Sequence, residues 1–145
     1  MTQSAEAVVF HEGALATVLL LHECPDGTRH VDWMLACDDS AHRPLITFRA
    51  AGRIDELAEG ASLPLERLGD HRPLYLEYEG EISGGRGTVR RLARGQFLAL
   101  QPGNGSGGQT LEVRWGGAAG GCQQILVLVP QIPPHWRVTC VTMGR

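Results

Sequence analysis

The stretch Thr17-Val-Leu-Leu-Leu-His22-Glu-Cys-Pro-Asp-Gly-Thr-Arg-His30-Val-Asp32-Trp-Met-Leu35 consists of two apolar runs separated by Pro25-Asp26-Gly27. Proline, aspartate and glycine in succession are typical of a tight turn. The stretch therefore predicts two antiparallel strands joined as a hairpin. Apolar and β-branched runs of similar length recur along the rest of the chain, which favours an all-β fold.

The whole sequence predicts an all-β fold, a small antiparallel β-barrel with one or two short helices. Predicted strands cover residues 16–23, 30–37, 45–48, 65–68, 74–79, 87–92, 96–100, 110–115, 122–129 and 137–141. Residues 53–60, closed by a glycine, have the only helical pattern. Glycine-rich segments at 83–87, 103–108 and 116–121 are predicted loops. We expect an N-terminal segment at 1–14 and a single barrel domain at 15–145.

The composition favours a globular protein and argues against a secreted, membrane-spanning or strongly basic one. A chain of 145 residues with 43% hydrophobic and 20% charged residues is typical of one globular domain. Its net charge of −3 provides no overall basic field for nucleic acid. The four cysteines form no C-x-x-C pair, the first residues do not resemble a signal peptide, and the most apolar stretch, 125–129, is too short to span a membrane. We therefore expect a cytoplasmic protein with reduced thiols and no membrane partner.

The hairpin carries a candidate metal site formed by His22, His30 and Asp32. Side chains alternate along a strand, so His30 and Asp32 share one face. Whether His22 joins them depends on the turn, because a two-residue loop places it on the other face and a three- or five-residue loop places it opposite His30 or Asp32. Two imidazoles and one carboxylate leave coordination positions open, as in catalytic sites. A histidine–aspartate hydrogen bond without metal explains the same pattern, and Cys24 is either an extra ligand or a thiol beside the turn.

These residues resemble the 3′-phosphoesterase domain of bacterial DNA ligase D. The first motif, His22…His30-Val-Asp32-Trp-x-Leu35, is similar to that family's His…His-Tyr-Asp-Phe-Arg-Leu-Glu signature. A second motif follows in the family's order: Leu65-Glu-Arg67-Leu-Gly-Asp70-His71-Arg-Pro-Leu-Tyr75-Leu-Glu-Tyr78-Glu79-Gly80-Glu-Ile82. The resemblance covers roughly residues 15 to 130.

The resemblance implies an enzyme that trims 3′-terminal phosphates and ribonucleotides from DNA ends. It implies a divalent metal held by His22, His30 and Asp32, with Mn²⁺ as the expected ion and Zn²⁺ as the alternative. His71 falls on the family's phosphate-contacting histidine, and Tyr75 falls on a neighbouring tyrosine. The partners implied are nucleic-acid 3′ ends, bound by local contacts, and DNA-repair proteins.

Several family positions differ in this chain. Met34 replaces the strand arginine that binds phosphate in the family, and Ala36 replaces a glutamate. Gly69 stands in place of a glutamate and Leu63 in place of an arginine. Phosphate binding therefore needs other cations. Arg49, in the position of a strand-end lysine, and Arg67 are the first candidates, followed by Arg72, Arg86, Arg90, Arg91 and Arg94. We expect Met34 beside the metal ligands, because it shares their strand face.

Four functions are compatible with these features. The first is the metal-dependent phosphoesterase, with activity weakened by Met34. The second is a metal- or nucleic-acid-binding module that keeps the barrel without catalysis. The third is a cupin-like oxygenase, which also places two histidines and a carboxylate on a barrel, although the second motif argues against it. The fourth is a structural protein whose histidines are only hydrogen-bonded.

Overall fold

A computed structural model describes residues 9–40, 42–101, 108–116 and 121–144, with the side chain of Gln101 excepted. Nine strands and two short 3₁₀ helices, η1 and η2, make up its regular structure. The strands are β1 Leu15–Glu23, β2 Arg29–Leu35, β3 Ile46–Ala50, β4 Ser62–Arg67, β5 Gly80–Glu81, β6 Thr88–Gln101, β7 Gln109–Trp115, β8 Gln123–Pro130 and β9 His135–Gly144. The helices are η1 Ile54–Glu56 and η2 Pro73–Leu76.

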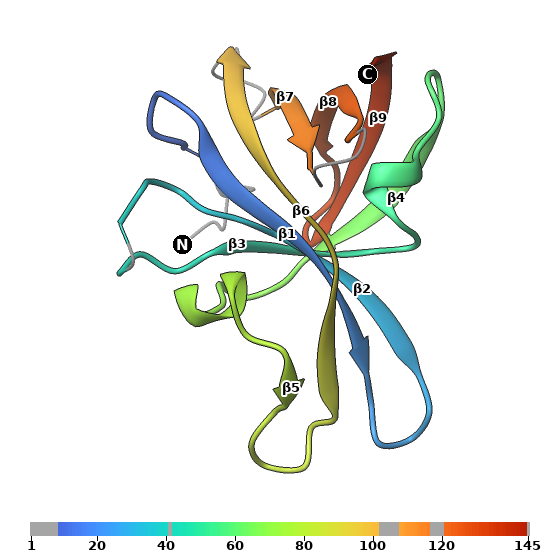
Figure 1. The fold of residues 1–145 in the computed structure, drawn as a ribbon. Helices are drawn as coiled ribbons and strands as arrows, with labels where there is room; N and C mark the ends of the chain where they lie inside the picture. The colour runs from blue at the N-terminus through green and yellow to red at the C-terminus, as the bar shows by residue number, and fades with distance from the viewer. Residues whose placement is uncertain (1–8, 41, 102–107, 117–120, 145) are drawn as a thin grey trace.

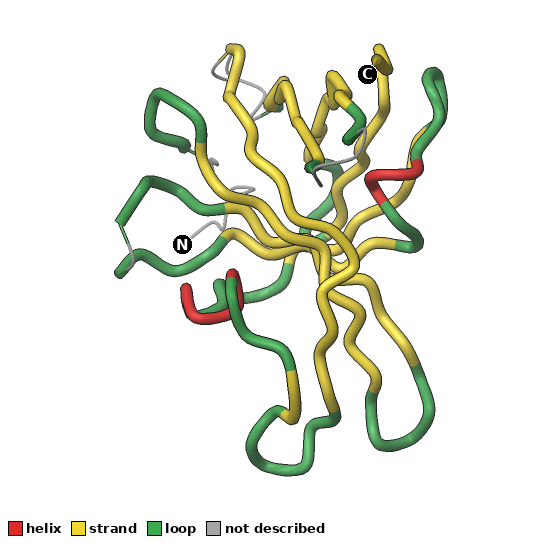
Figure 2. The backbone as a smooth tube through the Cα atoms, viewed as in Figure 1, coloured by secondary structure: helices red, strands yellow, loops and turns green. Residues whose placement is uncertain are grey.

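The strands form one antiparallel sheet in the order β1-β2-β3-β4-β9-β8-β7-β6-β5, and β1 also pairs with β6 (Figure 1). That last pairing closes eight strands into a barrel and leaves β5 attached outside the ring, along β6. The predicted all-β barrel is therefore confirmed. Figure 2 shows how small the helical part is, and no helix among the described residues is long and apolar enough to cross a membrane.

Alternate side chains of the strands build the core. Trp33 of β2, Phe48 of β3 and Trp136 of β9 contact one another in sequence, with ring centroids 6.0 and 5.4 Å apart. The indole nitrogen of Trp33 donates to the buried hydroxyl of Thr17, which in turn donates to the Met34 carbonyl. Because these polar groups are all paired inside, burying them costs little. The first hairpin is thus fixed to the core by its inward face.

Three predictions about local structure were wrong. Residues 53–60 form only the single turn η1, because the backbone is already extended at Leu57 (ψ 121°). Residues 74–79 form no strand; Pro73 begins η2 instead, which suits its fixed φ and missing N–H. The predicted strands 87–92 and 96–100 are parts of the one long strand β6.

The predicted loop at 83–87 does connect β5 to β6, and β5 itself was not predicted. Most of the predicted loops at 103–108 and 116–121, and the N-terminal segment up to residue 8, lie outside the described residues. The predictions made for those segments therefore remain predictions.

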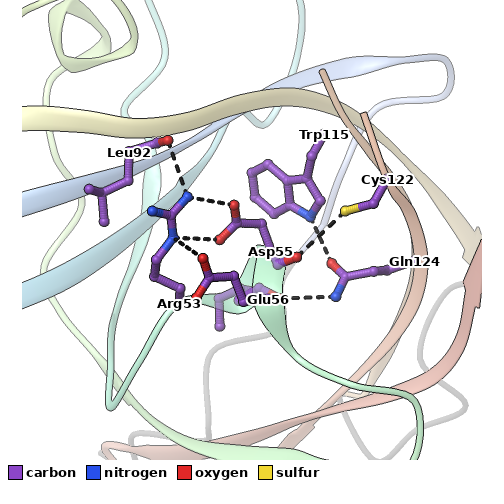
Figure 3. A network of polar contacts seen from close by, with 8 residues as sticks. Arg53, Asp55, Glu56, Leu92, Trp115, Cys122 and Gln124 are labelled. Atoms are coloured by element: carbon purple, nitrogen blue, oxygen red, sulfur yellow. Dashed lines mark hydrogen bonds and ion pairs between the residues drawn. The ribbon is translucent and has the colours of Figure 1, made fainter. Parts of the chain in front are cut away.

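A buried polar network attaches η1 to the sheet (Figure 3). The fully buried amide of Gln124 accepts from the Trp115 indole at 2.7 Å and donates to the carbonyls of Ile54 and Leu57, both at 3.0 Å. Beside it, Arg53 binds Asp55 through two hydrogen bonds of 3.0 and 2.7 Å. Side-chain contacts with residues distant in sequence thus hold the segment around η1, which does not form the regular helix that the local pattern predicted.

Replacing Gln124 by alanine should destabilise the barrel by about 2–4 kcal/mol, because the Trp115 indole and the Leu57 carbonyl lose their partner and the Ile54 carbonyl keeps only the Leu57 N–H. The free energy of unfolding in urea measures this. Gln96→Ala, on the exposed part of β6, is the control and should change that energy by less than about 0.5 kcal/mol. Equal unfolding midpoints for the two variants would show that the network carries no stability.

Candidate functional site

The β1–β2 hairpin decides which side chains share a face. His22 pairs directly with His30, and Leu20 pairs with Asp32, so a five-residue connection separates the strands. This is one of the loop lengths that place both histidines and Asp32 on the same face. In the turn, Asp26 accepts hydrogen bonds from the backbone and hydroxyl of Thr28, which hold the pKa of Asp26 below its usual value. Gly27 has a φ of 89°, a conformation that favours glycine.

His22 and Asp32 form the centre of the site. The ring nitrogen Nε2 of His22 lies 2.8 Å from the backbone oxygen of Arg86. Since a carbonyl only accepts, Nε2 carries a proton, and Nδ1 is the ring nitrogen left for another partner. That Nδ1 faces Asp32 Oδ2 at 3.9 Å. The two atoms are too far apart for a direct hydrogen bond.

Arg49 neutralises the other oxygen of Asp32. The two residues are direct partners in the β2–β3 register, and Arg49 Nε lies 3.3 Å from Asp32 Oδ1. Asp32 is only 3% exposed, so its charge needs such a partner. The sequence identified Arg49 as a candidate phosphate ligand; the structure gives it a carboxylate as its immediate contact.

The spacing of the His22 and Asp32 donor atoms fits two ligands of one metal ion. Bonds of about 2.0–2.2 Å allow two ligand atoms of one ion to lie up to roughly 4.2 Å apart, so His22 Nδ1 and Asp32 Oδ2 fit. The Arg86 carbonyl is the kind of outer partner that orients a metal-binding histidine. The ring of His30 is further out, 6.1 Å from that of His22 between centroids. Within the described part of the chain, no three His, Cys, Asp or Glu side chains are already grouped for metal binding.

His71 and Tyr75 reach the same region from the second motif. The backbone of His71 exchanges hydrogen bonds of 2.7 and 3.0 Å with Leu45, which ties it to the start of β3. Its Nδ1 lies 2.8 Å from the Gly69 carbonyl, so Nδ1 donates and Nε2 is left for another partner. The buried ring of Tyr75 meets the His71 ring edge to face at 6.0 Å. The imidazole is therefore held from both sides.

An open cleft of about 480 Å³ connects these groups. Its lining comes from the hairpin, from β3, from the second motif and from the turn before β6: His22, Asp32, Met34, Arg49, Gly69, Asp70, His71, Arg72, Tyr75, Ile82, Arg86 and Val89. The two motifs, separated by the 29 residues 36–64, thus both line one cavity. Figure 1 shows the β1–β2 and β5–β6 hairpins extending together from one end of the barrel.

The sequence predicted seven metal ligands and main catalytic candidates: His22, His30, Asp32, Arg49, Arg67, His71 and Tyr75. Five of them line the cleft, and two, His30 and Arg67, are not among the residues that line it. Arg67 Nη2 binds Asp70 at 3.3 Å, and its guanidinium lies over the Phe48 ring at 5.8 Å. Met34 lines the cleft and is 1% exposed, as its strand position predicted.

The cleft also contains two arginines that the sequence placed behind Arg49 and Arg67 as candidate phosphate ligands. Arg72 follows His71 directly, and Arg86 lies in the turn between β5 and β6. The glycines around Arg86 were the available signal, because they predicted a tight turn after the second motif. Only the paired hairpins show that this turn reaches His22.

None of the four cysteines forms a disulfide. All four are free thiols, and burial raises the pKa of Cys37, Cys122 and Cys140, which keeps them protonated at neutral pH. Cys24 Sγ lies 3.9 Å from His22 Nε2, on the side of the ring already bonded to Arg86. This contact leaves the alternatives of extra ligand or turn-flanking thiol unchanged.

Comparison with known proteins adds no assignment. No protein-family model matches the chain, and no curated protein matches it. The resemblance to the ligase D phosphoesterase domain therefore remains a prediction that rests on the two motifs.

If His22 is a metal ligand, His22→Ala should weaken Mn²⁺ or Zn²⁺ binding by at least about 100-fold and leave the barrel folded, because an open site is not a structural staple. Calorimetric titration of the metal-free protein measures the affinity, and circular dichroism measures the fold. His135→Ala, an exposed histidine on β9, is the control. Equal metal affinity in wild type and His22→Ala would exclude this site.

Proposed function

We propose that the chain is a divalent-metal-dependent phosphoesterase that removes phosphate or a ribonucleotide from the 3′ end of DNA. One observation supports this best: a single cleft collects the His22–Asp32 pair, His71 and three arginines. A facing pair of electron donors suits a cation, and arginines suit the oxygens of a phosphate. A metal-dependent phosphoesterase can use both kinds of group, the cation to polarise the phosphoryl oxygen and the arginines to bind the remaining oxygens.

The metal of this proposal would be held by His22 and Asp32, with His30 as the third ligand. Mn²⁺ is the proposed ion and Zn²⁺ the alternative. When bound, such an ion polarises a phosphoryl oxygen and lowers the pKa of bound water. The protein's own part is to keep His22 in one tautomer through the Arg86 carbonyl, and to neutralise Asp32 Oδ1 through Arg49.

His71 has the position of a phosphate contact or a proton donor. Its Nδ1 is occupied by the Gly69 carbonyl, so Nε2 is the atom that meets substrate. In the imidazolium form Nε2–H donates to a non-bridging oxygen or protonates the leaving group. Tyr75 supports this geometry through its ring contact. Arg67 acts indirectly, because its bond to Asp70 orients the segment that carries His71.

The size and openness of the cleft agree with a chain end as substrate. Its volume of about 480 Å³ is within the usual range for small-ligand sites. A net charge of −3 disfavours long tracks of backbone phosphates, so we propose local contacts to the terminal nucleotide only. Free thiols agree with a cytoplasmic protein working beside DNA-repair partners.

A second candidate is a non-catalytic module that binds metal or nucleic acid. Met34 favours it, because this buried thioether occupies the cleft where the family has an arginine. A thioether donates no hydrogen bond and brings no charge. The module and the enzyme differ in turnover alone, so an activity assay separates them.

The decisive assay uses a labelled DNA primer ending in a 3′-phosphate or one 3′-ribonucleotide, with and without Mn²⁺. The phosphoesterase proposal expects metal-dependent release, reduced by about 100-fold in His71→Ala, because one contact to the developing charge is lost. His135→Ala serves again as the control. Metal binding without any turnover would favour the module.

Met34→Arg tests how much activity is lost because the strand arginine of the family is absent. A guanidinium beside Asp32 on the same strand face should raise kcat/KM on 3′-phosphate ends by at least about tenfold, since it adds a charge-assisted contact. Met34→Leu, which preserves the apolar volume, should leave the rate unchanged. No gain from the arginine in a folded, metal-binding variant would argue against a weakened enzyme.

A further inference from the structure

The charges lining the cleft are unevenly paired. Two carboxylates, Asp32 and Asp70, and three arginines, Arg49, Arg72 and Arg86, line it. Asp32 is paired with Arg49, and Asp70 is paired with Arg67, which does not line the cleft. Both acids are therefore already neutralised. Arg72 and Arg86 have no acidic partner within the described residues, so the cleft keeps positive charge for an anion.

Arg86 is the better fixed of these two arginines. Its Nε donates to the Ser83 carbonyl at 2.8 Å, and its Nη2 lies 3.4 Å from the Ser83 hydroxyl. These bonds hold the guanidinium within its own turn and leave Nη1 and a second Nη2 hydrogen for a ligand. A guanidinium held in this way loses less conformational entropy when it binds.

The turn that carries Arg86 is attached to the candidate metal ligand. The Arg86 carbonyl accepts from His22 Nε2 at 2.8 Å. Next to it, Gly87 has a φ of 98°, and a Cβ there would overlap the backbone oxygen of Glu23. Only glycine allows this approach of the turn to the end of β1. The backbone of Arg86 thus fixes His22, and Arg86 is itself one of the residues that line the same cleft.

We propose that Arg86 binds the terminal phosphate monoester of the substrate and supplies a phosphate contact from a turn instead of from the strand position of Met34. This inference rests on the proposed function. A monoester has three non-bridging oxygens and up to two charges, whereas a diester has two such oxygens and one charge. A guanidinium fork gains most from the former. Arg86 therefore sets a preference for 3′-phosphate ends over 3′-ribonucleotide ends.

Arg86→Ala isolates this role, because it removes the guanidinium and keeps the backbone carbonyl that binds His22. We expect KM for the 3′-phosphate primer to rise roughly 10- to 100-fold with little change in kcat, and KM for the 3′-ribonucleotide primer to change about tenfold less. Arg86→Lys should recover part of the loss, as a point charge without the fork. Arg137→Ala, an exposed arginine on β9, is the matched control.

Binding of inorganic phosphate to the metal-free protein separates this inference from the proposed function. Calorimetry should show phosphate binding by wild type and Arg137→Ala, weakened roughly 10- to 100-fold in Arg86→Ala and reduced by added salt. Turnover in wild type with equal KM and equal phosphate affinity in Arg86→Ala would overturn the role of Arg86 and leave the phosphoesterase intact. Phosphate binding that depends on Arg86, without any turnover, would support the role of Arg86 and overturn the phosphoesterase proposal. A wild type that neither binds phosphate nor releases it would overturn both.

Discussion

Strand β1 is hydrogen-bonded along both of its edges, to β2 and to β6, and this double pairing is the constraint on which the rest of the molecule depends. The β1–β6 contact closes the barrel, and closure leaves no free edge between these strands. Close packing beside these strands requires glycine: a Cβ at Gly87 would overlap the Glu23 backbone, and one at Gly95 the Arg114 backbone. Gly87, just before β6, thus permits the close approach to the end of β1, and Gly95 permits that of β6 to β7.

The same strand connects the core to the cleft. One face of β1 carries Thr17, whose hydroxyl joins the core through Trp33, and the other face carries His22 at the cleft. Pairing with β2 sets the distance from His22 to Asp32, and the segment before β6 brings the Arg86 carbonyl to His22. A shift of β1 by one residue would exchange its two faces. Core stability and site geometry are therefore coupled through one strand.

Electrostatic compensation explains why the cleft is arranged around Asp32. A carboxylate that is 3% exposed is costly unless opposite charges or hydrogen-bond donors surround it. Arg49 covers one oxygen, and the other lies 3.9 Å from His22 Nδ1. That distance is too long for a direct hydrogen bond and fits two ligands of one cation. Arg72 and Arg86, which have no acidic partner among the described residues, leave positive charge at the cleft, which makes the site suited to a metal and an anion together.

The sequence alone determined the strand content, the first hairpin, and the common face of His30, Asp32 and Met34, because side-chain alternation is a local property. It erred at η1 and η2, where the carbonyls bound by Gln124 and the fixed φ of Pro73 override the local pattern. Tertiary structure decided that the loop after His22 has five residues, that Arg49 pairs with Asp32, and that Arg67 lies outside the cleft while Arg86 lies within it. These depend on strand register and barrel closure, which join residues distant along the chain.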